Sequence, residues 1–308
     1  MAARGIRRFR LPPPPDGFFP AEYQITVGGR LAVLFATIDI RSALESRLPF
    51  EPFPARVEGL VAVAHGSSWQ PIARTRLEDY CYAFDVVGER ICVLARRAHA
   101  IAGARLFHDG VEVGTASLGS GIEFLQCGVD GSIWTGYSDV GMDHNSKLPG
   151  MGWHGIIRFS PDGERIAAYA GSDIVHCYAL NVGSATTWAA WHPGFPIVEL
   201  TTDFKERRWL RTQWRGGFSA LAVSFPHVLA AGGFAEDAET LTLLRLAGDE
   251  RAKLLGTFDA REVLGIDSLA AAHVVGRGDV LHVIDHQEWI SVPAAVLNSE
   301  SLKPRRRP

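Results

Sequence analysis

Short apolar runs separated by turn residues recur along most of the chain. The clearest copy spans Ile122 to Tyr137, where Asp130 and Gly131 separate two runs rich in Val, Ile, Phe and Trp. Such runs around an Asp-Gly pair are typical of a β-hairpin, because glycine tolerates the positive φ that a tight turn requires. This stretch therefore predicts two antiparallel strands.

Five more copies of the hairpin pattern predict a repeat architecture. Their turns lie near Gly29, Gly88, Gly183, Pro226 and Gly278. The spacing from turn to turn averages about fifty residues, with about four short strands in each interval, which is typical of a β-propeller. Six similar units are too many for one β-sandwich. We predict an all-β fold, a six-bladed β-propeller of four-stranded antiparallel blades, with helix only in short pieces such as Ser42–Arg47.

The two ends of the chain bear on how the ring closes. Little chain remains for the last strand of the sixth blade, and the N-terminal run IRRFRL has the pattern of a strand. We expect this run to complete that blade, because closure removes an exposed sheet edge. The predicted organisation is a lead-in with the closing strand over residues 1–21, a single propeller domain over 22–297 and a basic C-terminal tail over 298–308.

Composition and charge limit the classes of binding partner and the expected cellular location. The 308 residues carry a formal net charge of −3 and a pI near 6.4, so no basic field argues for nucleic acid. No N-terminal apolar segment resembles a secretory signal, and no run approaches the roughly eighteen apolar residues of a membrane span. The expected location is cytoplasmic. The four cysteines lie in apolar runs without a C-x-x-C pair, which predicts buried, reduced thiols: Cys81, Cys92, Cys127 and Cys177.

Strand direction predicts which face of the propeller carries function. In each predicted blade, the inner strand is the first one in the chain, next to the central channel, and the second strand runs back antiparallel to it. Residues just before each inner strand and just after each second strand should therefore share one face. The first group is Glu22, Asp79, Glu123, His176, Phe218 and Asp267. The second includes Arg96, Arg97, His99, Tyr137, Asp139, Asp143, His144, Asn145, Trp153, His154, Trp191, His192, Asp285, His286 and Trp289.

This face concentrates chemistry-bearing side chains. Six of the eleven histidines fall on it, and its longest loop, residues 138–155, is rich in polar and aromatic residues. Long loops on a rigid scaffold are where sites are usually built. Polar loops also occur on any blade face, so each single residue has an ordinary surface interpretation beside the functional one.

Two constellations on this face suggest specific chemistry. Asp79, Glu123 and Asp267 with His176 could hold a divalent metal ion, since carboxylates suit Ca²⁺, Mg²⁺ or Mn²⁺ and histidine favours Mn²⁺ or Zn²⁺. A hydrated polar channel is the alternative. The second constellation could place a general acid or base beside stacking rings, or could only cap turns. It comprises Asp139, Asp143, His144, Asn145, Trp153, His154, Trp191 and His192.

These patterns define the candidate residues. The candidate catalytic residues are Glu123, His176, Asp267, His144 and His154, and the candidate metal ligands are Glu123, Asp267 and His176. The candidate ligand-binding residues are Asp79, Tyr137, Asp139, Asp143, Trp153, Trp191, His192 and His286. The sequence contains no G-x-S-x-G nucleophile motif, P-loop or dinucleotide-binding glycine motif after a strand.

The stretches VDGSIWTGYSD and GIIRFSPDGERIAAY resemble six-bladed propellers of the NHL and SMP-30/gluconolactonase/strictosidine-synthase-like superfamily. CYALNV and DGSIWTGYSDVG are also similar to segments of uncharacterised bacterial propeller proteins. The resemblance covers roughly residues 22–293. Its lactonase branch implies a channel metal held by carboxylates and asparagines, but the E-G-P motif of that branch is absent here and Asn181 lies too far into its strand to match. No catalytic residue is carried over.

Three functions remain open on this reading. In the first, the chain binds a small molecule, either as a hydrolase- or lyase-type enzyme or without catalysing a reaction. In the second, it binds a protein partner, with Trp153, Trp191 and Trp289 as interface anchors. In the third, it is a metal-dependent lactonase-like hydrolase. A tightly bound divalent ion would favour the third.

Overall fold

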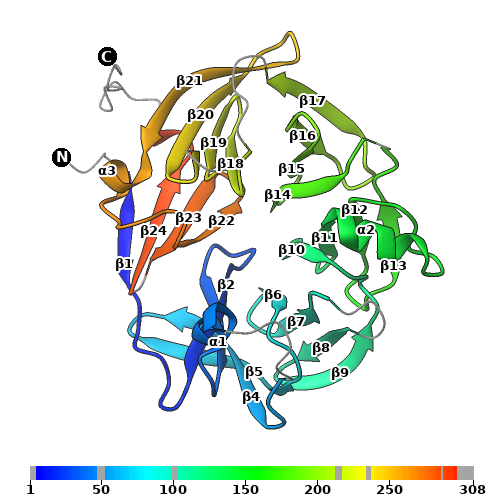
Figure 1. The fold of residues 1–308 in the computed structure, drawn as a ribbon, viewed down its shortest axis with the longest axis vertical. Helices are drawn as coiled ribbons and strands as arrows, with labels where there is room; N and C mark the ends of the chain where they lie inside the picture. Colours follow the sequence, from blue (N-terminus) through cyan, green and yellow to red (C-terminus); the bar gives the residue numbers. More distant parts are fainter. Residues whose placement is uncertain are drawn as a thin grey trace. The chain divides into compact units, whose positions relative to one another are not determined.

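The computed structural model describes residues 5–46, 53–98, 103–171, 173–211, 217–233, 237–285 and 287–296. It confirms the all-β prediction (Figure 1). The chain divides into two compact units, residues 11–170 and residues 171–308 together with 1–10. We call them the 11–170 unit and the 171–308 unit. The single domain predicted over residues 22–297 stays a prediction.

The 11–170 unit contains three antiparallel four-stranded sheets, each with its strands in chain order. The first sheet comprises β2 (Phe19–Ile25), β3 (Leu31–Ala36), β4 (Val57–His65) and β5 (Ser68–Leu77). The second comprises β6 (Tyr82–Val87), β7 (Ile91–Arg96), β8 (Ala104–His108) and β9 (Val111–Ala116). The third comprises β10 (Ile122–Cys127), β11 (Ile133–Tyr137), β12 (Ile156–Phe159) and β13 (Arg165–Ala168). The first strands of the sheets contact one another, β2 with β6 and β6 with β10.

The 171–308 unit contains an eight-stranded and a four-stranded sheet. The larger begins with β14 (His176–Val182), β15 (Thr187–His192), β16 (Ile197–Leu200) and β17 (Glu206–Arg211), and includes β18 (Ala220–Ser224), β19 (His227–Ala231), β20 (Thr240–Leu246) and β21 (Arg251–Asp259). The smaller comprises β22 (His273–Arg277), β23 (Val280–Asp285), β24 (Glu288–Pro293) and β1 (Arg7–Arg10).

The eight-stranded sheet differs from the separate four-stranded sheets that the sequence predicts. It consists of two antiparallel four-stranded sets whose last strands, β17 and β21, pair in parallel over Leu210 and Arg211 with Arg251 and Ala252. This pairing joins strands that are distant in sequence, so no local turn signal announces it. The described sheets therefore show a propeller-like fold without six separate sheets.

All six predicted hairpins form. In the copy that spans Ile122 to Tyr137, β10 and β11 are joined through Gly131, whose φ is +79°. The turn between β6 and β7 places both Gly88 and Glu89 at positive φ, as a type I′ turn requires. The turn residues therefore fix where each inner strand ends.

Helix occurs only in short pieces among the described residues, as predicted. Helix α1 (Ile40–Ser46) overlaps the predicted short piece. Helix α2 (Asp139–Ser146) lies in the predicted long loop, and helix α3 (Ala260–Leu264) lies in a stretch for which the sequence analysis predicts no element. The Ser138 hydroxyl accepts a hydrogen bond from Gly141 N at 3.1 Å and caps α2. The segment predicted as the longest loop is therefore helical at its start.

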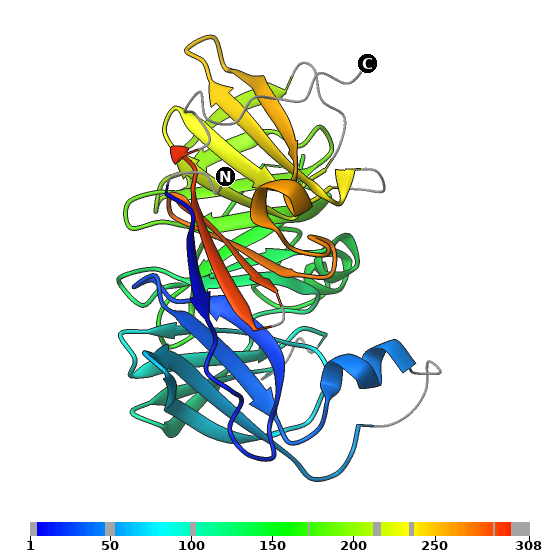
Figure 2. The ribbon, with the colours of Figure 1, turned by 90° about the vertical axis from the view of Figure 1, so that its left-hand side faces the viewer.

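The N-terminal run adds a strand to the last sheet, as predicted. Strand β1 pairs with β24 in an antiparallel register, and Figure 2 shows the two strands side by side. The ring of Phe9 lies 4.7 Å from that of Trp289, whose indole N–H donates to His282 Nδ1 at 3.0 Å. A row of rings thus attaches β1 to β24 and β23.

Buried side chains link the first strands of the 11–170 unit. Gln24 Nε2 on β2 donates to Leu125 O at 2.9 Å on β10 and to Phe84 O at 3.3 Å on β6. Asp85 on β6 accepts a hydrogen bond from Cys127 N at 2.7 Å. These side chains form hydrogen bonds with backbone peptide groups at the edges of the first strands.

Asn181 performs the same task in the 171–308 unit. Its amide nitrogen donates to Leu221 O at 2.9 Å and to Gly278 O at 2.8 Å, and its amide oxygen accepts from Gly278 N at 2.6 Å. Strands β18 and β22 approach so closely that a Cβ on Gly276 would lie 1.8 Å from Leu221 O. The three first strands of this unit are therefore packed without room for a side chain at Gly276.

No helix among the described residues has the length and apolar character needed to cross a membrane.

We predict that Gly276→Ala destabilises the protein by about 3 kcal/mol, because the backbone of β18 must move to admit the methyl group. Gly114→Ala on β9 is the matched control, since a Cβ there meets nothing within 4 Å. Urea denaturation should show a lower midpoint for the first variant only. Equal stability of both variants would show that β18 and β22 do not approach as described.

We also predict that acid destabilises the protein through His282. Burial, followed by the charge of Arg277, lowers the pKa of His282 to about 3. The unfolded chain takes up this proton near pH 6.5 and the folded chain does not, so unfolding is favoured as pH falls from 6.5 toward 3. Between pH 7 and 4, wild type should lose about 3 kcal/mol relative to His282→Gln. The exposed His65→Gln is the control, and parallel stability curves for all three proteins would contradict the prediction.

Candidate functional site

Arg97 connects the starts of two first strands in the 11–170 unit. It directly follows β7, and its backbone N donates to Cys81 O at 3.0 Å. Its Nε donates to Tyr82 O at 2.8 Å, and its Nη1 donates to Ile122 O at 2.9 Å and Glu123 O at 2.5 Å. The guanidinium therefore binds the beginning of β6 and of β10 at the same time.

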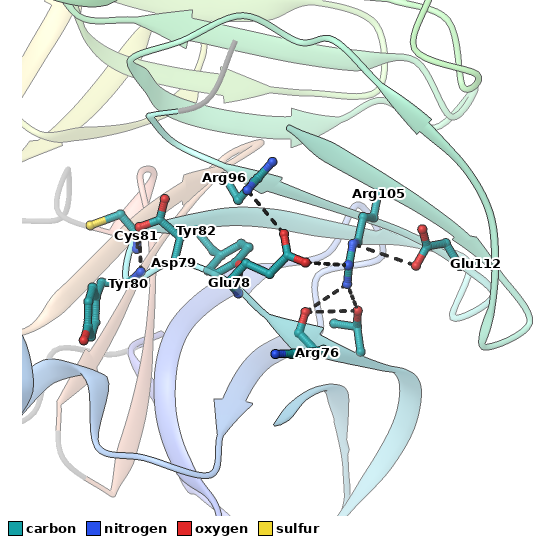
Figure 3. A network of polar contacts seen from close by, with 10 residues as sticks. Arg76, Glu78, Asp79, Tyr80, Cys81, Tyr82, Arg96, Arg105 and Glu112 are labelled. Carbon is teal, nitrogen blue, oxygen red and sulfur yellow. Dashed lines mark hydrogen bonds and ion pairs between the residues drawn. The ribbon is translucent and has the colours of Figure 1, made fainter. Parts of the chain in front are cut away.

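Arg97 and three carboxylates act on the same thiol, that of Cys81. Glu22 on β2 lies with Oε2 3.5 Å from Arg97 Nη2, which brings a third sheet to the same place. Asp79 accepts a hydrogen bond from Tyr80 N at 2.6 Å, and Figure 3 shows its side chain beside Cys81. Glu123 is exposed at a register shift at the start of β10. We call Glu22, Asp79, Cys81, Arg97 and Glu123 the arginine–carboxylate cluster.

Cys81 reports the electrostatics of this cluster. Burial raises the pKa of its thiol, and the negative charges of Asp79, Glu22 and Glu123 raise it further, while Arg97 opposes them. The thiol is therefore protonated at neutral pH. Cys81 is half-buried and precedes β6, whereas the sequence predicts a buried position inside a strand; Cys92, Cys127 and Cys177 are buried as predicted, and no disulfide joins the four.

A second polar network lies next to this cluster (Figure 3). Glu78 contacts Arg96 at 3.3 Å and Arg105 at 3.5 Å, and Arg105 also contacts Glu112 at 3.8 Å. Arg105 additionally donates to Arg76 O at 2.9 Å. Because both carboxylates are largely exposed, these ion pairs join the first and second sheets but contribute little to the free energy of unfolding.

Two histidines and several aromatic side chains lie in contact in the 171–308 unit. His176, the first residue of β14, is the register partner of His192, the last residue of β15. The His176 ring stacks on Tyr178 at 4.3 Å, and Tyr178 lies 5.1 Å from Phe195. Phe195 also meets the His192 ring, at 5.8 Å. His192 is exposed, and His176 and Tyr178 are half-buried.

Arg211 brings a positive charge to these rings. Its guanidinium carbon lies 5.1 Å from the centre of the Phe195 ring and 5.4 Å from that of Phe218. Burial lowers the pKa of Arg211 to about 10, which leaves it charged at neutral pH. We call His176, Tyr178, His192, Phe195, Arg211 and Phe218 the histidine–aromatic cluster.

The segment around α2 is not gathered into either cluster. Asp139 and His144 are exposed on the helix, and Asp143 pairs with Lys147 at 2.6 Å, which lowers the pKa of Asp143. Asn145 is buried and its Oδ1 accepts from Ser120 N at 2.7 Å, so it anchors the helix. The predicted acid–base role of this segment stays a prediction.

Tyr137 and Trp191 are buried, although the sequence places both on the ligand-binding face. The Tyr137 hydroxyl donates to Leu118 O, and the Trp191 indole N–H donates to Asp173 at 3.4 Å. Arg208 covers the Trp191 ring and binds the same carboxylate at 2.6 Å. Both side chains fill the interior, where a ligand has no ring face to contact.

The remaining candidates are dispersed. Trp153 is 47% exposed, while His154 has Nδ1 2.9 Å from Tyr169 O and Nε2 3.2 Å from Arg165. Asp267 is exposed between α3 and β22, which begins at His273, so it does not directly precede an inner strand as predicted. His286 lies outside the described residues.

The described residues show no candidate metal centre. Among them, no three His, Cys, Asp or Glu side chains come together in a metal-binding arrangement. The triad of Glu123, His176 and Asp267 draws on both units, and its convergence stays a prediction. Asn181, the asparagine nearest to the lactonase pattern, has its amide engaged by Leu221 and Gly278.

Sequence reasoning missed several members of the histidine–aromatic cluster. Tyr178, Phe195 and Arg211 lie in a strand, a loop and the end of an outer strand, and no motif connects them. The available signal is the pairing of His176 with His192 across one hairpin, which could have drawn attention to their neighbours.

Comparison with known proteins identifies the fold without a family. No protein-family model matches the chain, and no curated protein matches it. Virginiamycin B lyase from Staphylococcus aureus is similar at a TM-score of 0.50 and 11% identity, over 94% of this chain and 98% of that one. A streptogramin B lyase is similar at 0.51 and 13%, over 93% and 96%. These propeller-like structures support a propeller fold; the resemblance to the NHL and SMP-30 group stays a prediction.

We predict that Cys81 is the first cysteine to react with iodoacetamide in the folded protein, slowly at pH 7 and faster as pH rises. Asp79→Asn removes the charge that most raises the pKa of Cys81 after burial, so the pKa of the thiol should fall and alkylation at pH 8 should be faster than in wild type. Glu112→Gln, outside the cluster, should change nothing. Peptide mapping would contradict the geometry if another cysteine reacted first.

Proposed function

We propose that the chain is a six-bladed β-propeller with a single domain over residues 22–297. Six antiparallel four-stranded sets support this count, because the eight-stranded sheet consists of two such sets joined over only two residue pairs. β1 completes the last set from the other end of the chain, as propeller blades commonly do.

We propose further that the propeller binds a small molecule where the inner strands begin. The arginine–carboxylate cluster carries this proposal, because three sheets of the 11–170 unit contribute side chains to it. Its members are half-buried or exposed, so a ligand can reach polar groups that the scaffold holds in place.

Hydrolase- or lyase-type chemistry is the enzymatic form of this proposal. Glu123 and Asp79 are carboxylates that could exchange a proton with a bound substrate. The two similar solved structures are both named as lyases, which is compatible with an enzymatic propeller. The fold alone does not select the reaction.

Two competing functions have weaker support. Of the three tryptophans that would anchor a protein partner, Trp191 is buried and Trp289 is covered by Phe9, which leaves Trp153 exposed. A metal-dependent lactonase requires ligands that the described residues do not bring together. Metal analysis of untagged protein tests that alternative directly.

Ligand screening with two readouts tests the proposal. A panel of neutral and cationic metabolites should contain a compound that raises the melting temperature and slows alkylation of Cys81. Glu123→Gln should abolish both effects without lowering the stability of the unliganded protein, because Glu123 is exposed. Glu112→Gln is the matched control. A compound that stabilises the protein but leaves Cys81 equally reactive would place the site elsewhere, and a Glu123→Gln variant that unfolds would make that carboxylate structural.

A further inference from the structure

The histidine–aromatic cluster has the composition of a recognition site. His192 is exposed, and the half-buried rings of His176 and Tyr178 lie parallel within 28°. Tyr178 continues to Phe195, so aromatic surface extends inward from the exposed edge. Planar ligands stack on surfaces of this kind, in offset or tilted arrangements.

This surface includes a cationic side chain. Arg211 lies against Phe195 and Phe218, and burial has removed part of the water around its guanidinium. A partly desolvated cation gains more from a nearby anion than an exposed one does, because the surroundings screen the attraction less. The planar guanidinium is also suited to a carboxylate, which it can bind through two parallel hydrogen bonds.

We propose that the histidine–aromatic cluster binds a planar aromatic carboxylate. The ring of the ligand stacks against His176 and Tyr178, and its carboxylate pairs with Arg211. His192 supplies a hydrogen-bonding group at the exposed edge. The inference concerns the 171–308 unit alone and goes beyond the ligand proposed for the arginine–carboxylate cluster.

Strand β17 offers a matched control for Arg211. Arg207 on the same strand also covers rings, with its guanidinium carbon 4.6 Å from the centre of the Trp209 ring and 5.7 Å from that of Phe225. Neither ring belongs to the histidine–aromatic cluster. Arg207→Gln therefore removes a similar cation–ring contact without touching the proposed site.

Isothermal titration of the full chain with three probes tests the proposal. Naphthalene-2-carboxylate should bind at least about tenfold more tightly than naphthalene-2-carboxamide, which lacks the charge, and than cyclohexanecarboxylate, which lacks the planar ring. Arg211→Gln should reduce the preference for carboxylate over amide to near one. Arg211→Lys should keep part of it, and Arg207→Gln should keep all of it.

Tyr178→Leu separates stacking from charge. It should reduce the preference for the naphthalene ring over cyclohexane while the preference for carboxylate over amide remains. Circular dichroism and the melting temperature show whether each variant is folded. If Arg211→Gln does not fold, the ligand preferences of Arg211→Lys and Tyr178→Leu test the proposal. Absence of saturable binding by the naphthoate overturns the proposal, as does binding that Arg211→Gln and Arg211→Lys leave unchanged. Protection of Cys81 by other compounds would still support the arginine–carboxylate cluster, so the two proposals fail separately.

Discussion

The outer edge of each first strand is the constraint on which the structure depends. Strands β2, β6, β10, β14, β18 and β22 stand at the ends of their sheets or sets, so one edge of each has no neighbouring strand in its own sheet. A buried peptide group without a partner costs about 1–3 kcal/mol. Gln24, Asp85 and Asn181 meet this requirement by reaching across to the backbone of neighbouring first strands. Because these side chains are buried and engaged, they fix the spacing of the first strands within each unit.

As a result, side chains that are available to contact a ligand lie at the ends of the first strands and not in the middle. Side chains in the middle are occupied by structural hydrogen bonds, as the engaged amide of Asn181 illustrates. At the strand starts, Arg97 binds the carbonyls of Tyr82, Ile122 and Glu123 while remaining half-buried. A link of the same kind therefore leaves side chains within reach of solvent at the strand starts, where Asp79 and Glu123 lie.

The sequence predicts the fold better than the site, and the reason is the range of each interaction. Hairpins depend on local turn residues such as Gly131, and all six are found where the sequence places them. The pairing of β17 with β21 is not local and leaves no such signal. Asp79 and Glu123 are predicted to be neighbours because strand direction brings strand starts together, and both affect the same thiol. Tyr137 and Trp191 are buried because both faces of β11 and β15 are covered, so a position near a strand end does not guarantee exposure.

The two clusters differ in the charged side chains that they contain, and this difference is the basis of the two proposed ligand classes. In the arginine–carboxylate cluster, Glu22, Asp79 and Glu123 outnumber Arg97, whose Nε and Nη1 are committed to carbonyls and whose Nη2 faces Glu22. An anion there would meet carboxylates, so a neutral or cationic ligand is favoured. In the histidine–aromatic cluster, Arg211 lies among rings that carry no negative charge at neutral pH. An aromatic anion is favoured there for the same electrostatic reason, and the surrounding rings add the selectivity for shape that charge alone does not provide.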